Sequence, residues 1–242
     1  MSTIPTSTTP ERALVPAPSP SPSPGLPLGR DGRRLSLLDR LIAPADQALR
    51  TLSGVATASR PYPATAVGET ITKPADRRRI GALMRVNHSG EVSAQALYQG
   101  QAFVARSGPV KESLLEAGRE EVDHLDWCAR RIDELGERVS LLNPLWYAGS
   151  FAIGVLAGLS GDRFSLGFVA ETERQVGEHL QKHLQQLPEE DSRTRAIIEQ
   201  MRIDEERHGS SAMSAGGAPL PILVRSLMRV VAKIMTLTAT RI

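Results

Sequence analysis

Residues 120–128 read EEVDHLDWC, and residues 204–209 read DEERHG. Each stretch contains a glutamate that is followed three positions later by a histidine. Residues three apart in a helix lie on one face, so the carboxylate and the imidazole can reach the same metal ion. The two pairs are Glu121 with His124 and Glu205 with His208.

A further glutamate stands upstream of each pair. Glu91 precedes Glu121 by 30 residues, and Glu173 precedes Glu205 by 32 residues. A single Glu-x-x-His motif is common in helices, but the duplicated arrangement is specific. It predicts two helix pairs joined by a long crossover, which form a four-helix bundle around a site for two metal ions.

The hydrophobic periodicity beyond Asp76 also predicts helices. They cover residues 77–106, 110–135, 165–187 and 191–215, and no stretch has a convincing strand pattern. Core-facing positions at alternating steps of three and four include one of these glutamates in each helix. Four buried carboxylates would repel one another, so we expect metal cations to compensate them. Carboxylate and imidazole ligands suit iron or manganese better than copper.

The composition is that of a globular protein with one main domain. The chain has 242 residues, of which 40% are hydrophobic and 4% are aromatic, so aliphatic and small side chains must fill the core. Its net charge of +2 does not favour a nucleic-acid-binding protein. Cys128 is the only cysteine in the sequence, which excludes an intrachain disulfide, a CxxC pair and a thiolate zinc site.

The proline distribution divides the chain into three regions. Residues 1–34 contain SPSPSPSP and are predicted to form a disordered Pro/Ser-rich tail, without the basic start and apolar run of a signal peptide. Residues 35–75 are predicted to contain a short helical pair, broken near Pro44, and a linker. Residues 76–242 form the predicted metal-binding domain.

Two segments of this domain are unusually apolar or basic. Residues 139–161 carry no charge, but Asn143-Pro144 and several glycines interrupt them, which favours a crossover helix or a membrane-dipping segment over a membrane span. Residues 219–242 are predicted to form a basic amphipathic helix, which would lie on an anionic membrane or pack on the core with a solvated basic face. Ser150, Gly154 and Gly158 form a small-residue ridge suited to close helix packing.

Four stretches of the sequence resemble the demethoxyubiquinone hydroxylases of ubiquinone biosynthesis, which are ferritin-like di-iron carboxylate proteins. They are MRVNHSGEVSAQALYQGQ, EEVDHLDWC, VAETERQVGEHLQKHL and IIEQMRIDEERHG, and the resemblance covers residues 36–242. It implies an all-α, ferritin-like four-helix bundle with an apolar crossover insert and additional amphipathic helices. It also implies two iron ions per chain, with Glu121 and Glu205 as bridging ligands. The full implied ligand set is Glu91, Glu121, His124, Glu173, Glu205 and His208.

The same resemblance implies an O2-dependent di-iron monooxygenase. Its substrate would be 2-polyprenyl-3-methyl-6-methoxy-1,4-benzoquinol, hydroxylated on the ring before the last O-methylation of ubiquinone. One oxygen atom would enter the ring and the other would leave as water. The resemblance further implies an electron donor, a lipid-presenting partner protein, and peripheral attachment to the cytoplasmic face of the cell membrane. No nucleic-acid partner is expected.

Several other polar residues are candidates for supporting roles around this site. Asp204 is either a hydrogen-bond acceptor for a ligand histidine or a surface partner of Arg207. His179 is a candidate for a hydrogen-bond network near Glu173. Tyr98 and His183 are interpreted mainly as core residues, and Asn87 and His88 are predicted to begin or cap the helix that carries Glu91.

Two other classes of function remain open at this point. A ferritin-like iron-storage or oxidase protein would use the same metal site, but its outer helices should be polar and its assembly very large. A metal-free helical membrane adaptor would contain no iron after purification. A di-iron hydroxylase acting on another lipid or on a tRNA is a weaker alternative, because the sequence has no basic-aromatic surface for nucleic acid.

Overall fold

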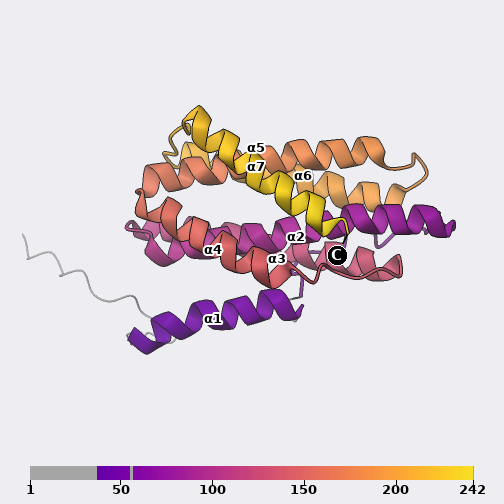
Figure 1. Cartoon of the computed structure of the whole chain (residues 1–242), viewed down its shortest axis with the longest axis horizontal. Coiled ribbons are helices and arrows are strands. Elements are labelled where there is room, and N and C mark those ends of the chain that lie inside the picture. Colours follow the sequence, from indigo (N-terminus) through magenta and orange to yellow (C-terminus); the bar gives the residue numbers. More distant parts are fainter. Residues whose placement is uncertain (1–36, 55–56, 242) are drawn as a thin grey trace, which may run out of the picture. The chain divides into compact units, whose positions relative to one another are not determined.

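The computed structural model describes residues 37–54 and 57–241, and within these ranges the chain forms helices and loops without strands (Figure 1). This confirms the all-α prediction. The chain divides into two compact units, Met1–Arg40 and Leu41–Ile242. The predicted disordered tail lies outside the described residues. Apart from residues 37–40, the features below belong to the second unit.

The predicted four-helix bundle is formed by helices whose ends lie within three residues of the expected positions. Helix ends follow local signals: the Asp191 side chain accepts a hydrogen bond from the Thr194 amide, and Gly136 has a φ of 73° just beyond the second bundle helix. The bundle helices are α2 (Pro74–Val104), α3 (Gly108–Glu134), α5 (Asp162–Gln186) and α6 (Ser192–Ser214).

The bundle interior on one side of the carboxylates is packed with aliphatic side chains and a single tryptophan, Trp127. Cys128 is fully buried there, and its Sγ lies 3.8 Å from Met201 Sδ. The prediction that Cys128 is a small core residue is therefore confirmed. Other buried members of this cluster include Ile80, Met84, Ile132, Leu180, Ile197 and Ile198.

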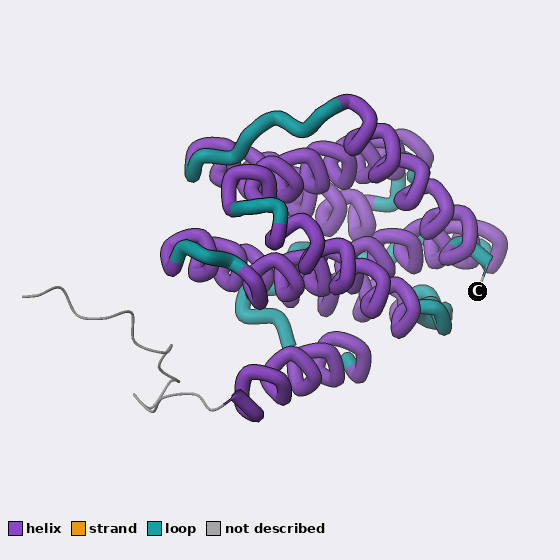
Figure 2. The backbone as a smooth tube through the Cα atoms, turned by 60° about the vertical axis from the view of Figure 1, so that its left-hand side comes forward, coloured by secondary structure: helices purple, strands orange, loops and turns teal. Residues whose placement is uncertain are grey.

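The uncharged insert forms α4 (Asn143–Leu159), which lies along α2 (Figure 2). Asn143-Pro144 begins this helix, because proline is well tolerated in a first turn. A Cβ at Gly154 would lie 2.4 Å from the Leu97 carbonyl oxygen, so the predicted small-residue ridge brings two backbones into direct contact. The opposite face of α4 is exposed. Within the described residues, no helix is long and apolar enough to cross a membrane.

The segment before the bundle differs from its prediction. A single helix, α1 (Leu37–Ser53), continues through Pro44 where a break was predicted. Proline removes one backbone hydrogen bond but does not by itself end a helix when packing continues on the other side. Here Thr51 is buried and donates to Gln95 Oε1 of α2 at 2.7 Å.

Asn87 and His88 also differ from their prediction. They lie in the middle of α2, because Pro74 starts this helix more than three turns earlier. Both are buried, and the Asn143 amide lies 3.2 Å from His88 Nδ1. Burial lowers the pKa of His88 to about 4, so its neutral ring accepts this hydrogen bond and ties the start of α4 to α2.

Candidate metal centre

The six residues predicted as metal ligands lie together in the bundle interior, one or two from each bundle helix. Their ligand atoms form two groups, and within each group all atoms lie within 4.8 Å of one another. Glu121 and Glu205 belong to both groups. One group is Glu91, Glu121, His124 and Glu205, and the other is Glu121, Glu173, Glu205 and His208.

The cluster is shielded from solvent, and its charges interact strongly. All six side chains are buried, with no more than 6% of any residue exposed. Burial, reinforced by the charges of Glu121 and Glu205, raises the pKa of Glu91 and of Glu173 well above the usual carboxyl range. Without a metal, these carboxyls therefore retain protons.

The pKa values of the two ligand histidines are raised, although burial alone would lower them. Burial opposes a charge on His124, but the carboxylates of Glu121 and Glu205 outweigh it and raise the pKa of His124 well above its usual value. Burial also opposes a charge on His208, but its close contacts with the carboxylates of the same two glutamates raise its pKa to about 11. The imidazolium protons thus occupy the space between carboxylates where a cation is needed.

Three buried atoms in this cluster lack a hydrogen-bond partner among the described residues: Glu121 Oε1, Glu205 Oε2 and His208 Nδ1. They face one another, since His208 Nδ1 lies 3.1 Å from Glu121 Oε1 and 3.4 Å from Glu205 Oε2. Unpaired buried polar atoms are costly, and a bound cation would satisfy all three at once. The residues present therefore fit a metal site.

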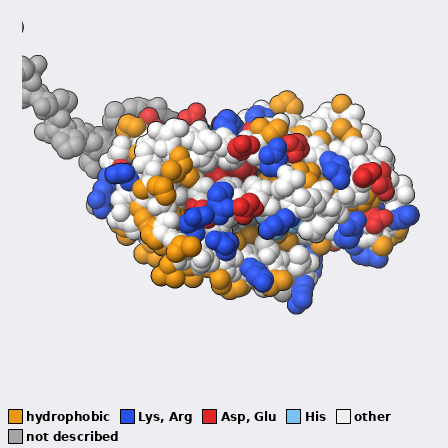
Figure 3. Space-filling model, turned by 90° about the horizontal axis from the view of Figure 1, so that it is seen from above, with side chains coloured by type: hydrophobic (Ala, Val, Ile, Leu, Met, Phe, Trp, Pro, Cys, Tyr) orange, Lys and Arg blue, Asp and Glu red, His pale blue; other side chains and the backbone are white. Residues whose placement is uncertain are grey.

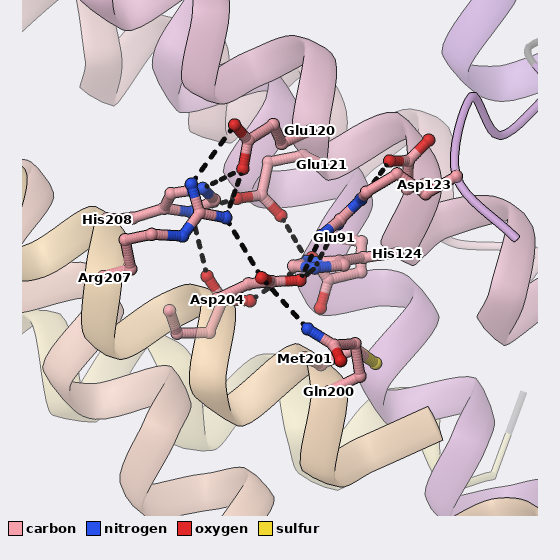
Figure 4. A network of polar contacts seen from close by, with 12 residues as sticks. Glu91, Glu120, Glu121, Asp123, His124, Gln200, Met201, Asp204, Arg207 and His208 are labelled. Atoms are coloured by element: carbon pink, nitrogen blue, oxygen red, sulfur yellow. Dashed lines mark hydrogen bonds and ion pairs between the residues drawn. The ribbon is translucent and has the colours of Figure 1, made fainter. Parts of the chain in front are cut away.

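Both histidines direct their far nitrogens at carboxylates of the opposite helix (Figure 4). His124 Nε2 lies 3.0 Å from Asp204 Oδ2, and His208 Nε2 lies 2.9 Å from Glu120 Oε2. Arg207 joins the two acceptors, donating to Glu120 at 2.6 Å and to Asp204 at 3.0 Å. A carboxylate at Nε2 fixes a proton there and directs Nδ1 toward the metal position. Both contacts suggested for Asp204 by the sequence are therefore present.

Glu120 was not predicted as part of the site, although the sequence contains a signal for it. Glu120 directly precedes Glu121, as Asp204 directly precedes Glu205. The repeated unit is therefore a pair of carboxylates followed by histidine, in which the first carboxylate supports the histidine of the other helix.

Glu120 provides a test of this arrangement. Glu120→Ala removes the acceptor of His208 Nε2, so we expect the affinity of the His208 group for Fe(II) to fall roughly 10- to 100-fold. Anaerobic Fe(II) titration measures this, with Glu116→Ala, an exposed position one turn earlier on α3, as the matched control. Equal affinities of Glu120→Ala and the wild type would refute the role of this contact.

Tyr98, interpreted as a core residue, also contacts the cluster. It is buried, and its hydroxyl donates to Glu173 Oε1 at 2.5 Å. His179 lies instead edge-on to His183, with ring centroids 4.0 Å apart, and its Nε2 has no hydrogen-bond partner within the described part of the chain. A network between His179 and the cluster therefore stays a prediction.

A groove of about 1000 Å³ leads from the surface to the cluster between α5 and α6. Its walls include Glu173 and Glu205, so an occupant could reach the ligand side of the centre. A Cβ at Gly177, one of the lining residues, would meet no atom within 4 Å. The lining also includes Leu220 and Arg225, at and beside the start of α7 (Ile222–Ala239). A volume of this size accommodates a drug-sized organic molecule.

The sequence is similar to known proteins over most of its length. Residues 78–239 match the family model of the ubiquinone biosynthesis protein COQ7. The chain is 57% identical over 217 residues to a 3-demethoxyubiquinol 3-hydroxylase of Ralstonia pickettii, covering 85% of this chain and 100% of the relative. It is 58% identical over 207 residues to the enzyme of that name from Cupriavidus necator, covering 85% and 100% of the two chains.

A third relative, the 3-demethoxyubiquinol 3-hydroxylase of Bordetella petrii, is 57% identical over 209 residues, which cover 86% of this chain and 92% of the relative. The family match, over residues 78–239, includes all six residues of the cluster. The chain belongs to the ubiquinone biosynthesis protein COQ7 family.

Proposed function

We propose that this chain hydroxylates the ring of 2-polyprenyl-3-methyl-6-methoxy-1,4-benzoquinol, the step before the last O-methylation of ubiquinone. The observation that carries this proposal is the pair of buried carboxylate–histidine groups that share Glu121 and Glu205. The chain belongs to a family of ubiquinone biosynthesis, and its relatives bear the name of this hydroxylase.

The proposed centre holds two iron ions, which supply the activation of O2 when bound. Glu121 and Glu205 would help to hold both ions, because each belongs to both groups. Glu91 and His124 would complete one ligand set, and Glu173 and His208 the other. Four carboxylates balance the charge of two divalent ions, while Asp204, Glu120 and Tyr98 hold the ligands in place from outside.

The groove between α5 and α6 is the proposed approach for the quinol ring. It reaches the cluster at Glu173 and Glu205, whereas the histidines and their acceptors lie on the α3 and α6 side. Its lining combines charged and polar side chains with small residues such as Ala170, Gly177 and Gly209, beside which a flat ring can lie. Burial of the cluster keeps bulk water from the reacting atoms.

A lipid-soluble substrate requires contact with a bilayer, and the helix surfaces support peripheral attachment. Figure 3 shows the side of the molecule on which α5 and α7 lie, where hydrophobic side chains gather along one edge beside Lys and Arg. Ile222 and Leu223, which lie in the chain between the groove-lining residues Leu220 and Arg225, are 76% and 79% exposed. Exposed apolar residues continue on α7 and α4, at Leu227, Val230, Ile234, Leu237, Leu145, Leu156 and Leu159.

The charge pattern of α7 fits an anionic bilayer surface. Val224 and Met228 pack on the inward side of α7, near Phe168 and Leu220. The exposed apolar face of α7 is therefore available to contact a membrane. Arg229 and Lys233 lie exposed among the apolar residues. A helix with these properties can lie in the interface of an anionic membrane, here proposed as the cytoplasmic face of the cell membrane.

We expect the double variant Leu223→Glu, Leu227→Glu to lose most of its binding to anionic liposomes. Each change removes apolar area from the bilayer and adds a charge that anionic lipids repel. Co-sedimentation at low salt measures this, with Ser211→Glu, an exposed position on α6, as the control for added charge. Undiminished binding of the double variant, or no binding by the wild type, would contradict membrane attachment through α7.

The reaction itself is tested by quinone profiles in a host that lacks its own demethoxyubiquinone hydroxylase. We expect the wild-type chain to convert the accumulated demethoxyquinone to ubiquinone, and Glu173→Ala to fail and to bind less iron. If iron-loaded wild type does not convert it, the hydroxylase proposal is wrong. A very large hollow assembly would then favour iron storage, an alternative with which the apolar faces of α4 and α7 do not agree.

The proposal includes two further partners. Placing one oxygen atom of O2 in the ring and releasing the other as water consumes two electrons, which an electron donor would supply. A lipid-presenting protein of ubiquinone biosynthesis would deliver the long-tailed quinol, and the exposed apolar faces of α4 and α7 are suitable surfaces for it.

A further inference from the structure

A segment before the bundle, residues 57–73, contacts both α3 and α6 on the histidine side of the cluster. We call it the strap. Hydrogen bonds fix it along its length, at sites far from the cluster as well as beside it. The remote contacts join Tyr62 to Glu134, Glu69 to Arg131, Thr70 to the Glu190 carbonyl, and Ala64 and Val67 carbonyls to Arg193.

The strap meets the metal centre through Arg60. Its Nε donates to Asp123 Oδ2 at 2.5 Å, and its NH1 donates to Asp204 Oδ2 at 2.8 Å. NH2 lies 3.4 Å from His124 Nε2, and the guanidinium lies over the Trp127 ring at 4.8 Å. The arginine thus links α3 and α6 beside a ligand histidine.

Arg60 is suited to this position by charge and by geometry. Asp123 and Asp204 are buried carboxylates on different helices, so a cation between them is required. The planar fork of arginine can address two carboxylates in fixed directions, which the single ammonium of lysine cannot. Asp204 Oδ2 accepts hydrogen bonds from both Arg60 Nη1 and His124 Nε2. The position of Arg60 therefore fixes the position of Asp204, the acceptor of His124.

We propose that Arg60 is a positioning residue for the metal centre. It holds Asp204 where this carboxylate orients His124, so that Nδ1 points at the ion bound with Glu91. The proposal rests on the two-iron centre proposed above. Arg60 should affect the ion held by His124 and not the one held by His208. The acceptor of His208 is Glu120, which Arg60 does not contact in the described structure.

The test compares Arg60→Gln and Arg60→Lys with Arg193→Gln in the full chain. Arg193 holds the strap through the Ala64 and Val67 carbonyls and Glu134 without touching the cluster. Anaerobic Fe(II) titration gives the affinity of each ion, and Mössbauer spectra of the loaded protein distinguish the two iron environments. Hydrogen exchange of residues 57–73 reports whether the strap itself has loosened.

We expect Arg60→Gln to weaken one of the two ions roughly 10- to 100-fold and to change one Mössbauer doublet while the other stays. Arg60→Lys should change the same doublet, because it keeps the charge and loses the fork. Arg193→Gln should loosen the strap and leave both ions as in the wild type.

Three results overturn the proposal. Native affinities and spectra in Arg60→Gln would show that Arg60 does not position His124. An equal loss in Arg193→Gln would show that Arg60 only anchors the strap. A wild-type chain that binds no iron would refute the centre and with it the proposed function, whereas the first two results leave that function intact.

Discussion

Replacing Glu205 with alanine is expected to remove both iron ions and to abolish ubiquinone formation. Glu205 belongs to both ligand groups, so its loss deprives each ion of one carboxylate and removes the charge between His124 and His208. The decrease in iron affinity should exceed the roughly 10- to 100-fold effect of a residue outside the ligand set. Glu91→Ala, by contrast, leaves the group around His208 complete.

Iron per chain, measured by mass spectrometry after anaerobic loading, separates these variants. We expect close to none in Glu205→Ala and an intermediate content in Glu91→Ala. Glu199→Ala is the matched control, because Glu199 lies on the same helix, is partly exposed, and pairs with Arg202 away from the cluster. Wild-type iron content in a folded Glu205→Ala protein would disprove the shared-ligand assignment.

Metal removal should produce the second large effect, a loss of thermal stability that grows with pH. In the metal-free chain His208 has a pKa of about 11, above its usual value, so its proton stabilises the fold fully below about pH 6.5. This contribution is lost as the pH rises toward 11. The raised pKa of Glu91 and of Glu173 acts in the same direction, because each holds a proton in the folded state that the unfolded chain releases above about pH 4.5.

Bound metal replaces these protons, so the stability of the metal-loaded protein should not fall in this way as the pH rises. At a metal concentration of about 1,000 times Kd, binding adds about 4 kcal/mol, or roughly 10 °C in Tm for a chain of this size. We expect this gap to widen between about pH 6 and 8. Thermal scans of loaded and metal-free protein across that range measure it, and calorimetry in two buffers measures the released protons. A gap that narrows with rising pH, or loading without proton release, would contradict the expected exchange.

Periodicity explains how much of the centre was predictable. The four glutamates and two histidines recur at helical spacing, so their faces follow from the sequence, and the structure brings all six together. Asp204 was suggested because it adjoins Glu205. Glu120 occupies the equivalent position beside Glu121 and could have been found by the same comparison.

Arg60 could not be found in this way. It lies 63 residues from Asp123 and 144 from Asp204, in a segment without helical periodicity. The errors also have local causes: a proline at residue 44 was interpreted as a break, and Asn87 and His88 as a helix start, although α2 begins at Pro74. Local preference suggested ends at these positions, and tertiary packing kept the helices continuous.

The contact between α2 and α4 limits how this protein can respond to a membrane. A Cβ at Gly100 would lie 2.3 Å from the Phe151 carbonyl oxygen, and Gly154 meets α2 as closely, so the two helices interlock at their backbones. Sliding of α4 along α2 would drive these backbones into each other. The helix that carries Glu91 must therefore follow any displacement of α4. If α4 meets the proposed lipid surface, its depth there would set the height of the proposed metal centre above the lipid.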